Sequence, residues 1–207
     1  TPKKRTALGR FAHEGAWPGL VIPGQPLVWY MGCDSRHEYI YKYVSNAVWD
    51  PRDIGRGMIA GDKYLNDGRL YVARFNADGS GEWLELKHGQ NGLDRTNSYY
   101  GFTDQADVLI NARLAADVLG ATKMDRPEWG AVNPANGEVY MTLTYNPSRA
   151  IDKVDAVIVS NGFPVRLSPV TADTYNIKLY RFACAVAVFL KIVKDRLKRL
   201  IGELILA

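Results

Sequence analysis

Short segments in which polar and apolar residues alternate recur along most of the chain, and turns rich in Gly, Asn and Asp separate them. Alternation with a period of two between such turns is typical of antiparallel β-strands. The clearest β-hairpin joins residues 69–75 to 82–86 through the polar turn 76–81. The other candidate strands are 27–31, 38–44, 129–132 and 138–144.

This pattern predicts a mostly β fold. Repeated strand–turn–strand units favour blades of antiparallel strands, as in a partial β-propeller, over a parallel sheet. Because the sequence has no strict repeat, a β-sandwich stays open as the alternative.

One helix is predicted within this β-rich part, over residues 103–119. Thr103 is placed to cap its N-terminus, and Gly120 is placed to end it. The apolar residues that share one face of this helix are Val108, Ala112, Ala115 and Leu119. The expected fold is therefore a partial propeller with one inserted helix.

The character of the sequence changes after Asp155, which predicts a β domain over 1–155 and an unrelated C-terminal segment over 156–207. Within that segment, residues 179–206 have the pattern of an amphipathic helix, with basic residues opposite an apolar stripe. Its uninterrupted apolar run is too short to span a bilayer. A helix that docks on a protein is favoured over one that lies on a membrane surface.

The composition is that of a globular protein, with 47% apolar and 23% charged residues. The formal net charge of +4 is modest and acidic residues are interspersed, which argues against a nucleic-acid surface but permits anionic substrates. Neither Cys33 nor Cys184 belongs to a CxxC or CxxH pattern, so a zinc finger is not expected. No signal peptide is visible, and because the chain opens without Met this absence does not define its compartment.

The segment 124–129, Met-Asp-Arg-Pro-Glu-Trp, connects the predicted helix to a predicted strand. Pro127 fixes its own φ and favours an extended conformation at Arg126, so the connection is stiff. A guanidinium such as that of Arg126 binds phosphate oxygens, and a carboxylate such as that of Glu128 binds hard metal ions. Taken alone, however, these residues fit a surface ion pair better than a site.

Further acidic candidates lie earlier in the chain. Glu14 has small neighbours that would let a ligand approach, or else it is an exposed carboxylate on a loop. Asp34, Arg36 and Glu38 alternate along a polar turn, where they serve a cation or interlock their charges at a strand end. The tyrosines at every second position of 39–43 are more typical of core packing than of a binding platform.

Six sequence blocks, taken in order across about residues 8–155, resemble the PhoX-type alkaline phosphatases. Each block is weak by itself, and the shared order carries the resemblance. The blocks are Gly-Arg-Phe-Ala-His-Glu at 9–14, Tyr-Met-Gly-Cys-Asp-Ser-Arg-His-Glu-Tyr-Ile-Tyr-Lys-Tyr-Val at 30–44, Leu-Tyr-Val-Ala-Arg-Phe-Asn-Ala-Asp-Gly-Ser-Gly at 70–81, Ala-Asp-Val-Leu-Ile-Asn-Ala-Arg-Leu-Ala-Ala-Asp at 106–117, Met-Asp-Arg-Pro-Glu-Trp at 124–129 and Gly-Glu-Val-Tyr-Met-Thr-Leu-Thr at 137–144.

The resemblance implies a secreted or periplasmic, metal-dependent phosphomonoesterase on a six-bladed propeller, with iron and calcium ions at one end of the central channel. Its substrates would be phosphomonoester small molecules, hydrolysed for phosphate scavenging. By motif, Glu14 and Glu128 correspond to carboxylates that hold the metal ions, and Arg126 to the arginine that binds substrate phosphate. Asp34 and Glu38 correspond to an acidic block of the family and are carried over as metal ligands.

The chain also departs from the family pattern. Cys33 replaces one acid of a Gly-Asp-Asp motif, and the family's N-terminal half, with a Cys-Glu-Glu motif whose cysteine bridges two irons, has no counterpart. We therefore expect part of a phosphatase that is inactive or weak as an isolated chain. The alternatives are a non-catalytic binding or assembly module, with residues 179–207 contacting a protein or a membrane surface, and a frameshifted end after residue 155.

Overall fold

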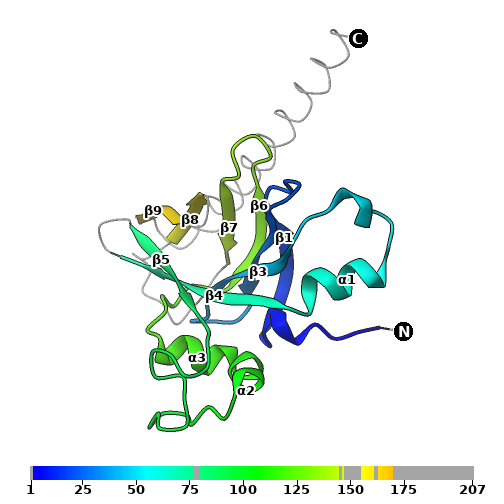
Figure 1. The fold of residues 1–207 in the computed structure, drawn as a ribbon. Coiled ribbons are helices and arrows are strands. Elements are labelled where there is room, and N and C mark those ends of the chain that lie inside the picture. The colour runs from blue at the N-terminus through cyan, green and yellow to red at the C-terminus, as the bar shows by residue number, and fades with distance from the viewer. Residues whose placement is uncertain (1, 77–79, 145, 147–154, 161–162, 170–207) are drawn as a thin grey trace.

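The computed structural model describes residues 2–76, 80–144 and 146, together with the backbone of 155–160 and 163–169. Two antiparallel sheets and several short helices make up the described part (Figure 1). In both sheets, strands that follow one another in the chain are neighbours in the sheet. The first sheet consists of β1 (His13–Pro18), β2 (Pro26–Cys33), β3 (Ile40–Val48), β4 (Gly68–Phe75) and β5 (Gly81–Glu85). The second consists of β6 (Pro127–Val132), β7 (Val139–Leu143), β8 (Asp155–Ser160) and β9 (Phe163–Pro169).

The prediction of a mostly β, antiparallel fold is confirmed. Within the described residues the strands form two open sheets and no closed one.

Tyrosine side chains in β3 and immediately before it build the main core. Tyr39, Tyr41 and Tyr43 are at most 1% exposed, and they share one face of the first sheet because side chains alternate along a strand. Two helices, α2 (Gln105–Ile110) and α3 (Ala112–Val118), contribute apolar side chains to the same cluster. The interpretation of the tyrosine stripe as core packing is confirmed.

The opposite face of the first sheet packs against the second sheet. Tyr30 and Ile40 lie on this face, in one buried cluster with Met141 and Leu143 of β7. The first sheet is thus covered on both sides, by α2 and α3 on one face and by β6 and β7 on the other (Figure 1).

The prediction of a single helix over 103–119 was wrong, because the helix breaks at Asn111. The Asn111 side-chain amide donates to Asp107 Oδ1 at 2.7 Å and to the Tyr100 hydroxyl at 3.1 Å, and its backbone leaves the helical region. The N-cap is also displaced by one residue, since Asp104 rather than Thr103 accepts the Asp107 N–H. The predicted apolar face is nevertheless buried: Val108, Ala112, Ala115 and Leu119 are at most 8% exposed.

Several elements were not anticipated. β1 lies in a segment expected to be a loop, and the short helix α1 (Met58–Leu65) lies within a Gly-rich connection. β8 and β9 extend the second sheet beyond residue 155, where the sequence pattern was weak. The predicted helix at 179–206 lies outside the described residues, and no described helix is long and apolar enough to cross a membrane.

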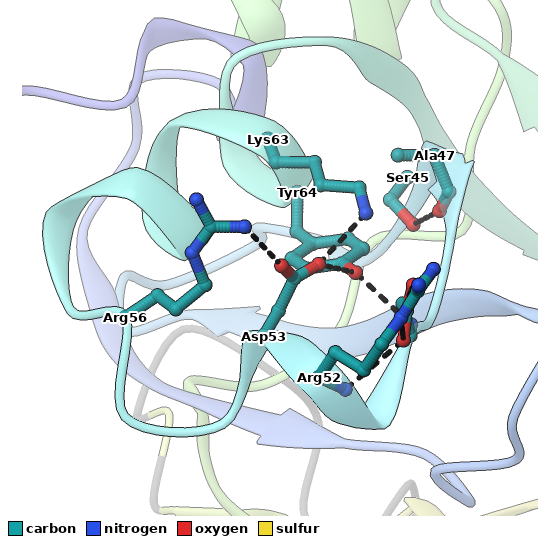
Figure 2. A network of polar contacts seen from close by, with 8 residues as sticks. Ser45, Ala47, Arg52, Asp53, Arg56, Lys63 and Tyr64 are labelled. Atoms are coloured by element: carbon teal, nitrogen blue, oxygen red, sulfur yellow. Dashed lines mark hydrogen bonds and ion pairs between the residues drawn. The ribbon is translucent and has the colours of Figure 1, made fainter.

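A buried carboxylate organises the connection between β3 and β4. Asp53 ends a 3-10 helix, η2 (Pro51–Asp53), and is only 5% exposed. It accepts hydrogen bonds from the Tyr64 hydroxyl at 2.6 Å, from Lys63 Nζ at 2.7 Å and from Arg56 Nη1 at 3.0 Å (Figure 2). These donors hold the pKa of Asp53 well below its usual value. The network therefore ties α1 to η2.

We predict that Tyr64→Phe destabilises the protein by about 1–3 kcal/mol, because the substitution removes a buried donor to Asp53 and the acceptor of the Asp50 N–H. Urea unfolding measures the loss. Tyr99→Phe is the matched control, since Tyr99 is 63% exposed, and its free energy of unfolding should change by less than about 0.5 kcal/mol. Equal stability of the two variants would contradict the structural role of Tyr64.

Candidate functional site

Backbone hydrogen bonds hold the segment 124–129 in an extended conformation between α3 and β6. The Met124 N–H donates to the Glu38 carbonyl at 2.8 Å, and the Thr144 N–H donates to the Arg126 carbonyl at 3.0 Å. One bond comes from the turn before β3 and the other from the end of β7. The Arg126 backbone is therefore fixed from both sides, as the stiffness of an Arg-Pro pair predicts.

The Arg126 guanidinium lies between two carboxylates from separate elements. Its Nη2 atom is 2.9 and 3.1 Å from the two Asp34 carboxylate oxygens and 3.3 Å from Glu128 Oε1. The side chain is 38% exposed, and within the described residues its Nε and Nη1 atoms make no hydrogen bond. One edge of the guanidinium is thus held by carboxylates, while donors remain for an anion from solvent.

Each carboxylate partner of Arg126 is itself held in place. Thr144 Oγ1 donates to Glu128 Oε1 at 2.5 Å, which links the end of β7 to β6. The Asp34 N–H donates to the Ala12 carbonyl at 2.8 Å, which links the turn after β2 to the segment before β1. The site is therefore assembled from both sheets.

A close backbone contact sets the position of β6 against β2. A Cβ atom added to Gly32 would lie 2.6 Å from the Pro127 carbonyl oxygen, well inside van der Waals contact. Only a residue without a side chain allows this approach. Gly32 and Pro127 are close in sequence to Asp34 and Arg126, so this packing determines whether the site forms.

Glu38 lies apart from this cluster and pairs with a different arginine. Its Oε1 atom accepts a hydrogen bond from Arg113 Nη2 of α3 at 2.5 Å, and Glu38 raises the Arg113 pKa. Glu38 is 8% exposed, and its Oε2 atom is buried without a hydrogen bond in the described part of the chain. Glu38 thus pairs with a helix arginine, and not with Arg36 of its own turn. A metal-binding role for Glu38 stays a prediction.

Glu14 is exposed at the surface of β1, and within the described residues it makes no hydrogen bond or ion pair. β1 lies beside β6 (Figure 1), and the rings of Trp17 and Trp129 are 6.3 Å apart. Gly130 also packs directly against Trp17. The structure thus brings the strands of Glu14 and Glu128 together without joining the two carboxylates.

The carboxylate oxygens around Arg126 suit a hard cation. Carboxylate oxygens are the ligands that calcium prefers. No group of three His, Cys, Asp or Glu side chains that would hold a metal ion occurs among the described residues. Burial raises the pKa of Cys33 to about 11, so its thiol is protonated and poorly suited to iron. Among the described residues, the site therefore has carboxylates of the kind that bind a hard cation, but no complete set of metal ligands.

Two side chains at the site were not predicted from the sequence. In the sequence, Arg113, the partner of Glu38, resembles any charged residue on the exposed face of a helix. Thr144 is the last residue of the block at 137–144 and was not singled out for a role. Neither carries a local signal, because their partners lie 75 and 16 residues away in the chain.

We predict that Gly32→Ala destabilises the protein by about 1–3 kcal/mol, since the new methyl group would displace the Pro127 backbone. The measurement is urea unfolding monitored by tryptophan fluorescence. Gly19→Ala is the control, because a Cβ there would make ordinary contact with Val28 at 3.4 Å. If both variants unfold at the same urea concentration, the close approach of β6 is not a structural constraint.

The sequence as a whole matches the family described as Alkaline phosphatase PhoX over residues 1–184. It is also similar to a solved structure, Pseudomonas fluorescens PhoX in complex with vanadate, a transition state analogue, with 46% identity and a TM-score of 0.65. The match covers 76% of this chain and 29% of that protein, so the chain spans well under half of the solved protein's length. No curated protein matches the chain. The family match runs past residue 155, where the predicted domain boundary itself stays a prediction. The chain belongs to the alkaline phosphatase PhoX family.

Proposed function

We propose that this chain supplies part of the phosphate-binding and metal-binding site of a phosphomonoesterase. The observation that carries the proposal is the Arg126 guanidinium. Asp34 and Glu128 hold it by one edge, while its other N–H donors make no hydrogen bond to any described residue. The related Pseudomonas fluorescens PhoX binds vanadate, a transition state analogue. A phosphoryl group in transfer needs a binding site of the same kind.

In this proposal Arg126 binds and orients the phosphate group. Its free N–H groups donate to phosphate oxygens, where a guanidinium fits two oxygens at once. Asp34 and Glu128 keep the guanidinium from turning away, and Thr144 keeps Glu128 in place. Because positioning is complete before the substrate arrives, the interaction favours the transition state without a reorganisation cost.

Carboxylates of the chain would hold metal ions beside the phosphate. Glu14 and Glu128 are the principal candidates, and Asp34 and Glu38 are the further ones; their oxygens suit calcium. Iron, which the family resemblance implies, needs ligands beyond those described. When bound, such cations neutralise phosphate charge and activate the attacking oxygen.

We infer that the chain carries part of such a phosphatase, since it covers 29% of the solved relative. The consecutive antiparallel strands of each sheet have the order of a propeller blade, which supports a partial propeller. As an isolated chain it would turn over phosphomonoesters weakly or not at all. A secreted or periplasmic location, where such substrates are scavenged, fits this proposal.

We predict that Arg126→Ala weakens binding of vanadate to the purified, calcium-loaded chain by about tenfold or more, because charge-assisted hydrogen bonds are lost. Isothermal titration calorimetry measures the dissociation constant. Arg95→Ala is the control, since Arg95 is exposed and makes one long hydrogen bond to the Thr103 carbonyl at 3.5 Å. Unchanged vanadate affinity in Arg126→Ala would overturn the assigned role.

We also predict that the double variant Glu14→Gln/Glu128→Gln binds calcium at least about tenfold more weakly than the unchanged chain, because each substitution removes a charged oxygen ligand. Equilibrium dialysis with calcium measures this binding independently of activity. Glu82→Gln is the matched control, because Glu82 pairs with Arg74 on β4. If calcium binding is lost equally in the control, or kept in the double variant, these carboxylates do not hold the metal.

A further inference from the structure

β6 contains one residue more than the stretch of β7 with which it pairs. Pro127 is the register partner of Leu143, and Gly130 is the register partner of Met141. Three steps along β6 thus match two steps along β7, which defines a β-bulge. A bulge redirects the side chains of the bulged strand, and bulges are frequent beside functional sites.

The bulge brings Glu128 and Trp129 to the same face of the second sheet. The residues on either side of them pair with side chains of the buried cluster between the sheets, and register partners share a face. Glu128 and Trp129 therefore both face away from that cluster. Their surroundings agree: the Trp129 side chain is 66% exposed, and Glu128 contacts Thr144, which alternates with the buried Leu143.

Trp129 is held in this position from two sides. Thr142 Oγ1 accepts a hydrogen bond from the Trp129 N–H at 3.1 Å and donates one to the Trp129 carbonyl oxygen at 3.1 Å. The ring of Trp17, which packs on Gly130, lies 6.3 Å from the Trp129 ring. The exposed indole is thus fixed at its backbone and has a second aromatic ring beside it.

This indole lies next to the candidate phosphate site. Arg126 Nη2 is 3.3 Å from Glu128 Oε1, and Trp129 follows Glu128 directly on the same face. One carboxylate therefore has a guanidinium on one side and an exposed aromatic surface on the other. A phosphomonoester consists of a charged phosphate joined to an organic group, and these two neighbouring surfaces match its two parts.

We propose that Trp129 is a specificity-determining residue that stacks against the aromatic group of phosphomonoester substrates. The inference rests on the proposed function, in which Arg126 holds the phosphate. Two aromatic rings in offset or edge-to-face contact attract each other beyond the effect of the apolar area that they bury. Phosphomonoesters of phenols are therefore favoured over those of small aliphatic alcohols.

The test compares the binding of benzylphosphonate and ethylphosphonate to the full, calcium-loaded chain by isothermal titration calorimetry. Neither compound has an ester bond to hydrolyse, and the benzyl group supplies the ring. In the unchanged chain, we expect benzylphosphonate to bind about fivefold or more tightly than ethylphosphonate, because it alone gains the ring contact. In Trp129→Ala this preference should fall below about twofold, while the affinity for ethylphosphonate changes by less than about twofold.

Tyr99→Ala is the matched control, because Tyr99 is 63% exposed and its hydroxyl contacts Asp117 of α3. It should keep the preference for benzylphosphonate. A preference that persists in Trp129→Ala, or that is lost equally in Tyr99→Ala, overturns the inference.

Binding of vanadate separates this inference from the proposed function. If vanadate and ethylphosphonate bind but the unchanged chain does not prefer benzylphosphonate, the aromatic contact is wrong and the assignment of Arg126 stands. If none of the three anions binds to the unchanged chain, the proposed phosphate site is wrong and the inference fails with it.

A second pair of variants tests whether the bulge positions the indole. Thr142→Val removes both hydrogen bonds to the Trp129 backbone, so the preference for benzylphosphonate should fall by about twofold or more. Thr142→Ser keeps the hydroxyl group and should keep the preference. Circular dichroism verifies that both variants are folded. An equal preference in the two variants would contradict the positioning role of Thr142.

Discussion

The Pro127 carbonyl oxygen lies where a side chain at position 32 would begin, and the candidate site depends on that contact. Because Gly32 has no Cβ, β6 approaches β2 closely enough for the two sheets to meet at their polar ends. Asp34 follows Gly32 by two residues, and Arg126 immediately precedes Pro127. The close approach that Gly32 allows thereby places the Arg126 guanidinium beside the carboxylates of Asp34 and Glu128.

Charge pairs at this end of the structure are divided between two arginines. Arg126 is held by Asp34 and Glu128, whereas Arg113 of α3 is held by Glu38. Glu38 is also joined to Met124 through its backbone carbonyl. The helix layer therefore supports the segment that carries Arg126 without supplying a partner to the Arg126 guanidinium.

The periodicity of apolar residues predicted those parts of the fold that depend on neighbouring residues in the sequence. The tyrosines of 39–43 alternate with a period of two and are buried as expected, and the apolar face of 103–119 is buried although the helix breaks. β1 was missed because His13–Pro18 is poor in β-branched residues and pairs irregularly with β2. The break at Asn111 depends on side-chain bonds to Asp107 and Tyr100, which hydrophobic periodicity does not reveal.

The site was predictable to the extent that a family resemblance singled out its residues. Arg126 and Glu128 are two positions apart, so their proximity follows from the sequence. Asp34 joins them from 92 residues away, and its contact depends on how the two sheets pack. Glu38 was grouped with Asp34 because the two residues share a turn. Their contacts with distant residues, which the sequence does not reveal, pair them with different arginines.

The 92 residues between Asp34 and Arg126 also bear on how the chain is made. A ribosome releases β1 to β5 and both core helices before Arg126 emerges, and in the folded chain side chains of β2 to β5, α2 and α3 share one buried cluster. Until β6 and β7 are synthesised, one face of the sheet that carries Gly32 and Asp34 is uncovered. The site is consequently completed only after β6 and β7 have been synthesised, and the uncovered sheet face is where premature association between nascent chains would begin.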